Sequence, residues 1–429
     1  MLGAPVDTVA GADAEWILGE LRRHRQALHR IPELDFELPR TIEYVRHHLD
    51  GLSCEIFEPC RSCVCAYFDA GCDSTVAVRA DMDALPIEEE SGVPYASRIK
   101  GRMHTCGHDN HTAMLLGAAK LLKRHEDEIE GTVKILFQPG EETLEGAKAM
   151  IEAGILENPH VDAALMFHDI AGSPVKEGTV GVFGPGAVYA SSGRFEIHIK
   201  GVGGHGAAPD WTHNPLGAMC AIYQGIHEIV AEHRSPFDSC TMTVGKMSAG
   251  DSANIIPETA IMQGTIRTFS KQVGERLRKD LVTLVEYVGK AKGVTAEVTF
   301  GTACPPLVVD SNVHKSFLCS MKEMFGDEAW DMRTAWGGAY SKSTSAEDFS
   351  YIAEKVPSGF GWIFLGDSRQ GRKWGCHNPK VQFNDAYLYR GAAAYTKAAM
   401  DWLLENAAAG TVSDCIRQAE ETLYEMAGN

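Results

Sequence analysis

Residues 75–83 read TVAVRADMD, and this stretch decides the fold class of the chain. An almost wholly apolar run ends abruptly in two carboxylates, which is typical of a strand buried on both faces of a sheet. The same pattern recurs in residues 133–142 (VKILFQPGEE) and 163–169 (AALMFHD). The sequence therefore predicts several buried strands whose ends carry chemically reactive side chains.

Helical patterns separate these strands, at residues 111–123 and 144–153. Alternating strands and helices predict an α/β fold with a mixed, largely parallel sheet flanked by helices. Parallel strands end at the same edge of a sheet, and ligands bind at that edge. We therefore expect the acidic and imidazole side chains that follow the strands to share one site.

The pattern changes near Gly193, where apolar and polar residues begin to alternate, as in a strand exposed on one face. Asn214 and Pro215 are well placed as the N-cap and first residue of a helix. The order β-α-β-β-α-β predicts a small ferredoxin-like α+β domain. Its remaining elements are a second helix and three more strands, expected at residues 273–288, 241–247, 260–267 and 294–300.

From about Cys304 the chain returns to α/β character, with a strand at residues 362–365 and a closing helix at 387–404. A length of 429 residues exceeds what one compact core normally holds. We expect one discontinuous α/β domain with a second domain inserted into it. Their bounds are expected at residues 1–188 with 303–429, and at 189–302.

Charge and composition argue against several classes of protein. Lys and Arg number 40 against 58 Asp and Glu, a formal net charge of −18, which disfavours binding to nucleic acid or anionic membranes. No apolar run is long enough to cross a bilayer, and the start, MLGAPVDTVAGADAEW, is unlike a secretory signal. Twelve cysteines without such a signal are expected to be free thiols, so we expect a cytoplasmic protein.

The densest reactive cluster is residues 103–111, MHTCGHDNH. Imidazole and thiolate bind borderline metals such as zinc. Cys106 and His108 have only a glycine between them, so an extended loop can aim both at one ion. The alternative is a helix N-terminus that is merely polar, and the segment favours the metal site.

Further candidates follow the other strands or lie in a loop. Glu141 and Glu142 are adjacent, so one can bind a metal while the other transfers a proton. Singly these residues are weak evidence, because the acidic pair could open a helix and His168 and His377 could be core or loop histidines. As a set they suit two divalent metal ions with Glu141 left as a base, which is machinery for hydrolysis. The set of ligands is Cys106, His108, Glu142, His168 and His377.

The inserted segment contributes a third group of residues. Residues 203–209 (GGHGAAP) form a glycine-rich loop that presents His205. Asn254 and Arg267 can bind a carboxylate, Arg267 through a two-pronged contact. Without the set of metal ligands, the simpler interpretations would be that His205 is an ordinary loop histidine and that Arg267 is a surface charge on a strand.

Five cysteines gather between Cys54 and Cys72 and include one C-x-x-C, from Cys60 to Cys63. This spacing occurs in metal and redox sites, but here it has no matching second pair. The segment is a weak candidate, and its role is left open.

In this order, the motifs resemble those of the amidohydrolase branch of the dinuclear metallopeptidases. That branch includes aminoacylases, hippurate hydrolases and indole-acetyl-amino-acid hydrolases. The likeness runs over nearly the whole chain, from residues 28–33 to 383–385. The segments most specific to the branch are residues 79–86, 103–111, 138–142, 264–267 and 346–349.

The resemblance implies a zinc-peptidase-like catalytic domain that holds two divalent cations in the five ligands above. Zn²⁺ or Mn²⁺ is expected, and Co²⁺ and Ni²⁺ also tolerate such ligands. Cys106 stands where related peptidases use a bridging Asp. Glu141 would be the general base and Asp83 the carboxylate that orients the site. The inserted domain would be a lid that forms a homodimer.

The resemblance also implies roles in the lid. His205 would stabilise the oxyanion, across the dimer, while Asn254 and Arg267 would bind the substrate carboxylate. Departures from the family pattern at Asp210 and Asp251 border the expected pocket and leave the acyl group and the amino acid open.

We therefore predict a metal-dependent amidohydrolase that cleaves the amide bond of an N-acyl or aryl-acyl amino acid. A metal-activated water, deprotonated by Glu141, would attack the carbonyl. The first alternative is a dipeptidase or carboxypeptidase with the same metal site. A more remote alternative is a non-catalytic binding protein that retains the fold.

Overall fold

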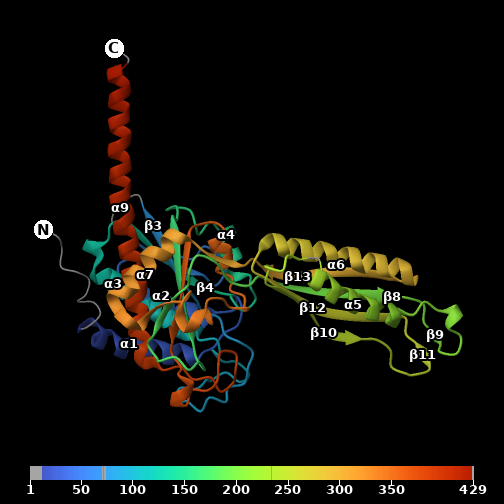
Figure 1. Ribbon diagram of the computed structural model, residues 1–429. Coiled ribbons are helices and arrows are strands. Elements are labelled where there is room, and N and C mark those ends of the chain that lie inside the picture. Colours follow the sequence, from blue (N-terminus) through green and yellow to red (C-terminus); the bar gives the residue numbers. More distant parts are fainter. Residues whose placement is uncertain (1–11, 70, 72–73, 233, 428–429) are drawn as a thin grey trace. The chain divides into compact units, whose positions relative to one another are not determined.

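The computed structural model describes residues 12–69, 71, 74–232 and 234–427. The first eleven residues, which include most of the segment judged unlike a secretory signal, and Cys72 therefore lie outside the described residues. The chain divides into two compact units, traced by colour in Figure 1. Unit 1 comprises Met1–Gly186, Val309–Ser341 and Ile352–Asn429, and unit 2 comprises Ala187–Val308 and Lys342–Tyr351.

The sheet of unit 1 has eight strands in the order β1-β2-β4-β3-β5-β16-β6-β15. Its central strands β4, β3, β5 and β16 are mutually parallel, and antiparallel pairs occur on both sides of them. The prediction of a mixed, largely parallel sheet is confirmed. The strands are β1 (Glu55–Phe57), β2 (Val64–Asp69), β3 (Thr75–Asp81), β4 (Thr132–Gln138), β5 (Ala163–Ile170), β6 (Val180–Val182), β15 (Ala329–Asp331) and β16 (Ser358–Phe364).

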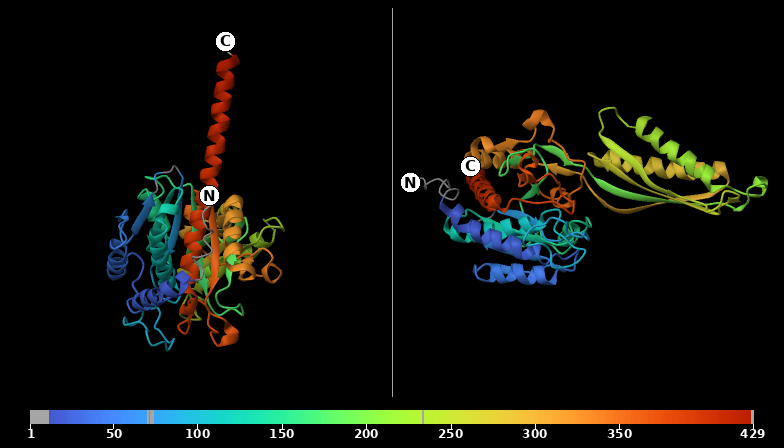
Figure 2. Two further views of the ribbon diagram at one scale, coloured as in Figure 1. Left: turned by 90° about the vertical axis from the view of Figure 1, so that its left-hand side faces the viewer. Right: turned by 90° about the horizontal axis from the view of Figure 1, so that it is seen from below.

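Helices flank this sheet (Figure 2), and its apolar core includes side chains of α1, α3, α7 and α9. The helices of unit 1 are α1 (Ala12–His29), α2 (Pro39–Asp50), α3 (His108–Arg124), α4 (Gly146–Glu152), α7 (Ser311–Phe325) and α9 (Leu388–Ala427), and the short α8 (Ser350–Ala353) spans the boundary between the units. No helix in the described ranges combines the length and apolarity that crossing a membrane requires.

The last helix is longer than expected. The sequence predicts its end near residue 404, whereas α9 continues to Ala427 (Figure 1). Gly410 and Val412, which lie beyond the predicted end, have poor helix propensity. The surrounding Ala, Glu, Gln and Leu residues favour a helix strongly enough to outweigh them.

Strands β3 and β4 are buried along their whole length, which explains their apolar sequences. The two basic residues within them have partners. Arg79 donates to Asp81 at 2.8 Å, and Lys134 Nζ donates to three backbone carbonyls at 2.9–3.0 Å. Because β4, β3 and β5 are adjacent and parallel, the segments that follow them emerge at one edge of the sheet.

Unit 2 contains a four-stranded antiparallel sheet in the order β10-β12-β8-β13. Its elements follow one another as β-α-β-β-α-β, as the sequence predicts, and both helices pack on one face of the sheet (Figure 2). Asn214 Oδ1 accepts the amide of Leu216 at 3.0 Å at the start of the first helix. These elements are β8 (Ser192–Lys200), α5 (Pro215–Glu232), β10 (Cys240–Ser248), β12 (Thr259–Thr268), α6 (Lys271–Lys292) and β13 (Thr295–Cys304).

A segment distant in sequence also belongs to unit 2. Ser343 exchanges backbone hydrogen bonds with Val188 and Ala190 at 2.8 and 3.0 Å, which ties Lys342–Tyr351 to this unit. Nothing in the sequence indicated this contact. Two short pairs complete the strands, β9 (Gly204–His205) with β11 (Ile255–Ile256), and β7 (Gly186–Tyr189) with β14 (Leu307–Val309).

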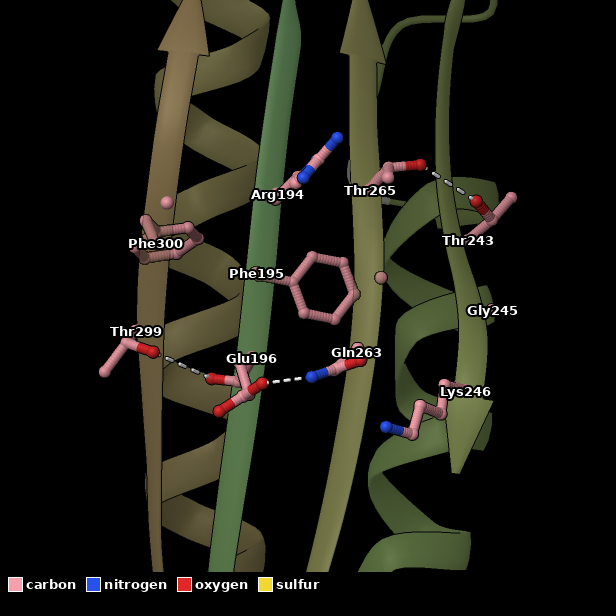
Figure 3. A pocket seen from close by; sticks show the side chains of 12 residues that line it. Arg194, Phe195, Glu196, Thr243, Gly245, Lys246, Gln263, Thr265, Thr299 and Phe300 are labelled. Carbon is pink, nitrogen blue, oxygen red and sulfur yellow. Dashed lines mark hydrogen bonds between the residues drawn. The ribbon is translucent and has the colours of Figure 1, made fainter. Parts of the chain in front are cut away.

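The face of the unit 2 sheet opposite its helices carries a shallow groove of about 630 Å³ (Figure 3). Glu196 accepts a hydrogen bond from Gln263 there, and the Thr243 and Thr265 hydroxyls lie 3.2 Å apart. The lining includes none of the predicted site residues. It does include Arg194, which is close enough to Arg267 for the two charges to interact.

Candidate metal centre

A glycine turn positions the first two predicted ligands. Gly107 precedes α3 with φ +95°, a backbone conformation that favours glycine. A Cβ at this position would lie 2.1 Å from Asp169 Oδ1, so no other residue fits. The chain can therefore turn sharply between Cys106 and His108 and direct both side chains toward the carboxyl ends of the strands.

The structure brings all five predicted ligands together within unit 1. Cys106 Sγ lies 3.5 Å from His168 Nε2 and 3.2 Å from His377 Nε2. Glu142 Oε1 lies 3.4 Å from His377 Nε2 and 4.0 Å from His108 Nε2. The side chain of His377 is 54% exposed while the other four are largely buried, so the cluster opens to solvent on the His377 side.

Cys106 is shared by two groups of three donors. One group is Cys106, His108 and His168, and the other is Cys106, Glu142 and His377, with the donor atoms of each within 4.8 Å of one another. Thiolate, imidazole and carboxylate are the donors of zinc and of neighbouring transition metals. A shared thiolate between two triads has the count and arrangement that two divalent cations require.

His108 supplies a direct test of whether a cation fits. Its Nδ1 donates to the carbonyl oxygen of Asp83 at 2.8 Å, so Nε2 is the ring nitrogen that faces the cluster. Nε2 is buried and has no hydrogen-bond partner among the described residues. The nearest acidic oxygens, on Asp81 and Glu142, are 3.7 and 4.0 Å away, too far for a hydrogen bond. A buried, unpartnered imidazole nitrogen fits a metal ligand.

Asp83 holds the two glutamates in place. Its carboxylate accepts the backbone amide of Glu141 through Oδ1 and that of Glu142 through Oδ2, both at 3.1 Å. Its carbonyl also orients His108. Glu141 itself is buried and groups with His108 and Glu142 within 4.8 Å. One side chain thus fixes the backbone of the candidate base and of one candidate ligand.

The electrostatics of the cluster favour a positive charge. Burial opposes the charged form of His108, but the carboxylates of Asp81 and Asp83 outweigh burial and raise its pKa well above 6.5. Burial also opposes ionisation of Glu142, yet the contact with His377 and the charge of His108 lower its pKa. Burial lowers the pKa of His168 well below 6.5, which keeps it in the neutral form that binds metals.

Three neighbouring residues take no specific role in the sequence prediction. His111 Nδ1 lies 2.6 Å from Asp81 Oδ1, and the amide of Asp169 donates to His111 Nε2 at 2.8 Å. With His108 and His168 they form further groups of close donors. The signal for them was present, because His111 lies three residues after His108 on one helix face and Asp81 two residues before Asp83.

A buried ion-pair network anchors the start of α3 to α1. Arg25 Nε donates to Asp109 Oδ2 at 2.9 Å, and His29 Nδ1 lies 2.7 Å from the same oxygen. All three side chains are at most 2% exposed. Asp109 follows His108 directly, so this network fixes the helix turn that carries the ligand.

In unit 2, Arg267 is placed to bind an anion. Its Nη1 is buried without a hydrogen-bond partner in the part of the chain that the structure describes. Burial lowers the pKa of Arg267, and the nearby Arg194 acts in the same direction. Two cationic groups with an unpartnered donor fit a carboxylate ligand.

His205 and Asn254 lie together, at the other end of the unit 2 sheet from Arg267. The amide of Gly206 donates to the Asn254 carbonyl at 2.8 Å, in the ribbon of β9 and β11. Strand β8 separates this ribbon from the Arg267 end, and its seven steps of about 3.3 Å amount to roughly 23 Å. Within one copy of the chain, neither His205 nor Asn254 can therefore contact the same small substrate as Arg267, so the expectation that Asn254 and Arg267 bind one carboxylate does not hold within a single chain.

The cysteine-rich segment has no disulfide among its described residues, and all ten described cysteines of the chain are free. Cys63 Sγ and Cys65 Sγ are 3.5 Å apart, and the side chain of Cys60 is close enough to Cys63 to interact with it. Burial raises the pKa of Cys63 well above its usual value, so this thiol stays protonated.

The fold and this donor set define a metal-dependent hydrolase of amide bonds. The chain belongs to peptidase family M20/M25/M40, whose sequence profile matches residues 77–401. The predicted family and the metallo-amidohydrolase class are therefore confirmed.

Three known proteins illustrate the similarity. IAA-amino acid hydrolase ILR1-like 2 of Arabidopsis thaliana is 35% identical over 393 residues, covering 91% of this chain and 86% of that protein. N-acetylcysteine deacetylase of Bacillus subtilis (strain 168) is 35% identical over 367 residues, covering 85% and 92%. The crystal structure of the Bacillus subtilis YXEP protein, described as a dinuclear metal binding peptidase from the M20 family, has a TM-score of 0.76 at 29% identity, covering 91% and 99%.

Proposed function

We propose that this protein hydrolyses the amide bond of N-acyl amino acids with the help of two divalent cations. The observation that carries the proposal is the pair of donor triads that share Cys106, with Glu141 beside them. The similarity to an IAA-amino acid hydrolase and to an N-acetylcysteine deacetylase supports an acyl group on the nitrogen of an amino acid.

The residues proposed to hold the cations are Cys106, His108, Glu142, His168 and His377, and Zn²⁺ or Mn²⁺ suits this mixture of soft and hard donors. When bound, two such cations would lower the pKa of a water molecule and polarise the substrate carbonyl. Glu141 takes the proton of the attacking water and returns it to the leaving nitrogen. Asp83 keeps Glu141 in reach by accepting its backbone amide.

Substitution of the proposed base tests this mechanism. Glu141→Gln keeps the size of the side chain and removes its basicity. We expect a loss in kcat on the order of a hundred- to ten-thousand-fold while two cations per chain are retained, because general-base catalysis contributes that much. Glu145→Gln is the matched control, since Glu145 is a nearby exposed glutamate. A Glu141→Gln protein with both cations and nearly normal turnover would refute the role.

A peptidase activity is the second candidate, favoured by the similarity to a solved M20 peptidase. The two candidates differ in the acyl group of the scissile amide. In a dipeptide this group carries a free α-amine, whereas in an N-acetyl or N-benzoyl amino acid it does not. A free amine would need an acidic partner in the pocket. A panel of N-acetyl amino acids, N-benzoyl amino acids and free dipeptides distinguishes them by kcat/KM.

Arg267 is the residue proposed to bind the substrate carboxylate, with Asn254 assisting and His205 stabilising the oxyanion. Because His205 and Asn254 lie together, separated from the Arg267 end of the sheet by about 23 Å of strand, both meet the substrate only from a second copy of the chain. We therefore propose a homodimer, formed through unit 2 acting as a lid and dimerisation domain.

Complementation tests the dimer. His205→Ala and Arg267→Ala proteins, each expected to be nearly inactive, are mixed and allowed to exchange subunits. Mixed dimers contain one site with neither substitution, so activity should recover to about a quarter of wild type at equal amounts. Mixing two batches of the same variant is the control. If activity did not recover although subunits had exchanged, His205 and Arg267 would either act in one site from the same subunit or not belong to the active site.

A further inference from the structure

A second thiol lies against the candidate metal ligand Cys106. The side chains of Cys376 and Cys106 are close enough to interact, and both residues belong to unit 1. Cys106 is in the loop before α3, whereas Cys376 is in the loop after β16 and immediately precedes His377. The mechanism proposed above makes no use of Cys376.

Backbone contacts hold the two thiols together. The amide of His377 donates to the Thr105 carbonyl at 3.0 Å, so the peptide unit that follows Cys376 is bonded to the one that precedes Cys106. Cys376 and Cys106 therefore each adjoin one of the two peptide groups that this hydrogen bond joins, and a disulfide requires Cα atoms about 4.4–6.8 Å apart.

The loop that carries Cys376 is also closely packed. A Cβ at Gly172 would lie 2.6 Å from the amide nitrogen of Gly375, so no side chain fits between the two segments. His377 has φ +65°, an uncommon conformation for a residue with a side chain. Main-chain packing therefore holds the two segments that carry the thiols close together.

We propose that Cys106 and Cys376 form a reversible disulfide when the protein has lost its cations, and that this disulfide blocks metal reloading. The inference rests on the proposed function for the role of Cys106 as a ligand. A thiol committed to a cation is not available for the disulfide, so the metal-loaded protein is protected.

Hydrogen peroxide is the oxidant. One thiolate attacks the peroxide, so that an S–O bond forms, the O–O bond breaks and one water leaves. The second thiol attacks the resulting sulfenic acid, so that the S–S bond forms, the S–O bond breaks and a second water leaves. The two thiols lose two hydrogens and two electrons in total, and a reducing dithiol reverses the change.

Peptide mapping of the full-length protein tests the proposal. Protein stripped with a chelator and protein loaded with Zn²⁺ are each treated with a small amount of hydrogen peroxide, alkylated and digested without reduction. We expect a cross-linked pair of peptides containing Cys106 and Cys376 in the stripped protein only. Loss of Zn²⁺ uptake should accompany it and be reversed by dithiothreitol.

The pair Cys60 and Cys63 is an internal comparison, since these thiols are also in contact but lie outside the donor cluster. Cys376→Ser should abolish the dithiothreitol-reversible loss of uptake. Cys319→Ser, at an exposed cysteine, should behave as wild type. If Cys376→Ser does not fold, the cross-link map of the wild-type protein decides alone.

Absence of the Cys106–Cys376 cross-link, or a cross-link only between Cys60 and Cys63, overturns the proposal. A dithiothreitol-reversible loss of Zn²⁺ uptake that persists in Cys376→Ser also overturns the proposal. Failure of the untreated protein to take up Zn²⁺ would instead contradict the proposed function, and the cross-link would still be read by mass.

Discussion

Replacing Asp83 by Asn tests how far the candidate centre depends on one buried carboxylate. Asp83 accepts the amides of Glu141 and Glu142, one on each oxygen and both at 3.1 Å. Asn keeps one oxygen and turns an NH₂ group toward the other amide. One buried amide thus loses its acceptor, and the remaining hydrogen bond loses the help of a charge.

The expected size of the effect follows from these contacts. A hydrogen bond to a charged group contributes about 1.5–3 kcal/mol, and leaving a buried donor unpaired costs a similar amount. Because the two amides belong to the proposed base and to a proposed ligand, we expect the loss in cation affinity and in kcat. A factor of roughly ten to a hundred in each corresponds to that energy.

Two measurements check this prediction. Competition with a chelating indicator gives the cation dissociation constant, and kcat is then measured with cations saturating. Asp127→Asn is the control, since Asp127 is exposed and belongs to a short helix that precedes β4, whereas the donor cluster lies at the carboxyl ends of the strands. Cation affinity and kcat both within twofold of wild type would show that Asp83 does not hold the centre.

Three further outcomes are expected. Gly107→Ala should lose bound cations, because its Cβ would lie 2.1 Å from Asp169 Oδ1. Gly154→Ala is the control, since Gly154 also has a positive φ but open space around it and so reports only the backbone strain of about 1–2 kcal/mol. Equal metal content in the two variants would contradict a clash at Gly107. Burial, assisted by His48, lowers the pKa of His24 from 6.5 to about 4. The unfolded chain then binds a proton that the folded chain does not, so about 3 kcal/mol of stability present above pH 6.5 is lost as the pH falls toward 4. Denaturation at several pH values should show that the free energy of unfolding depends less on pH in His24→Asn than in wild type. The same pH dependence in both proteins would contradict this role of His24. Removing cations with a chelator should lower the melting temperature, by an amount equivalent to about 2.7 kcal/mol at a cation concentration a hundred times the dissociation constant, and an unchanged melting curve would argue against a bound cation.

The sequence predicted which residues lie together where the signal was local. Cys106 and His108 flank a glycine, and Glu141 and His168 follow buried strands, so chemistry and strand periodicity pointed to the same positions. Parallel strands must end at one edge of a sheet, and for this reason a one-dimensional pattern was enough to bring these residues together. His377 lies in a loop without such a local signal and entered the prediction only as a member of the whole set of donors.

Other features could not be derived in this way. The end of α9 was misplaced, although the residues around Gly410 and Val412 favour a helix. The hydrogen bonds of Asp83 and the contact between Cys106 and Cys376 join segments that are tens to hundreds of residues apart. Such contacts depend on sheet order and loop packing, which leave no periodic trace.

The sequence by itself determined the fold class, the family and the candidate donor residues, since strand burial, helix periodicity and ligand chemistry are properties of short segments. Only the tertiary structure decided which donors share Cys106, which atom of His108 faces the cluster, and that His205 and Arg267 lie at opposite ends of one sheet. These facts arise from packing between distant segments, because the position of a side chain depends on the neighbours that the whole fold provides.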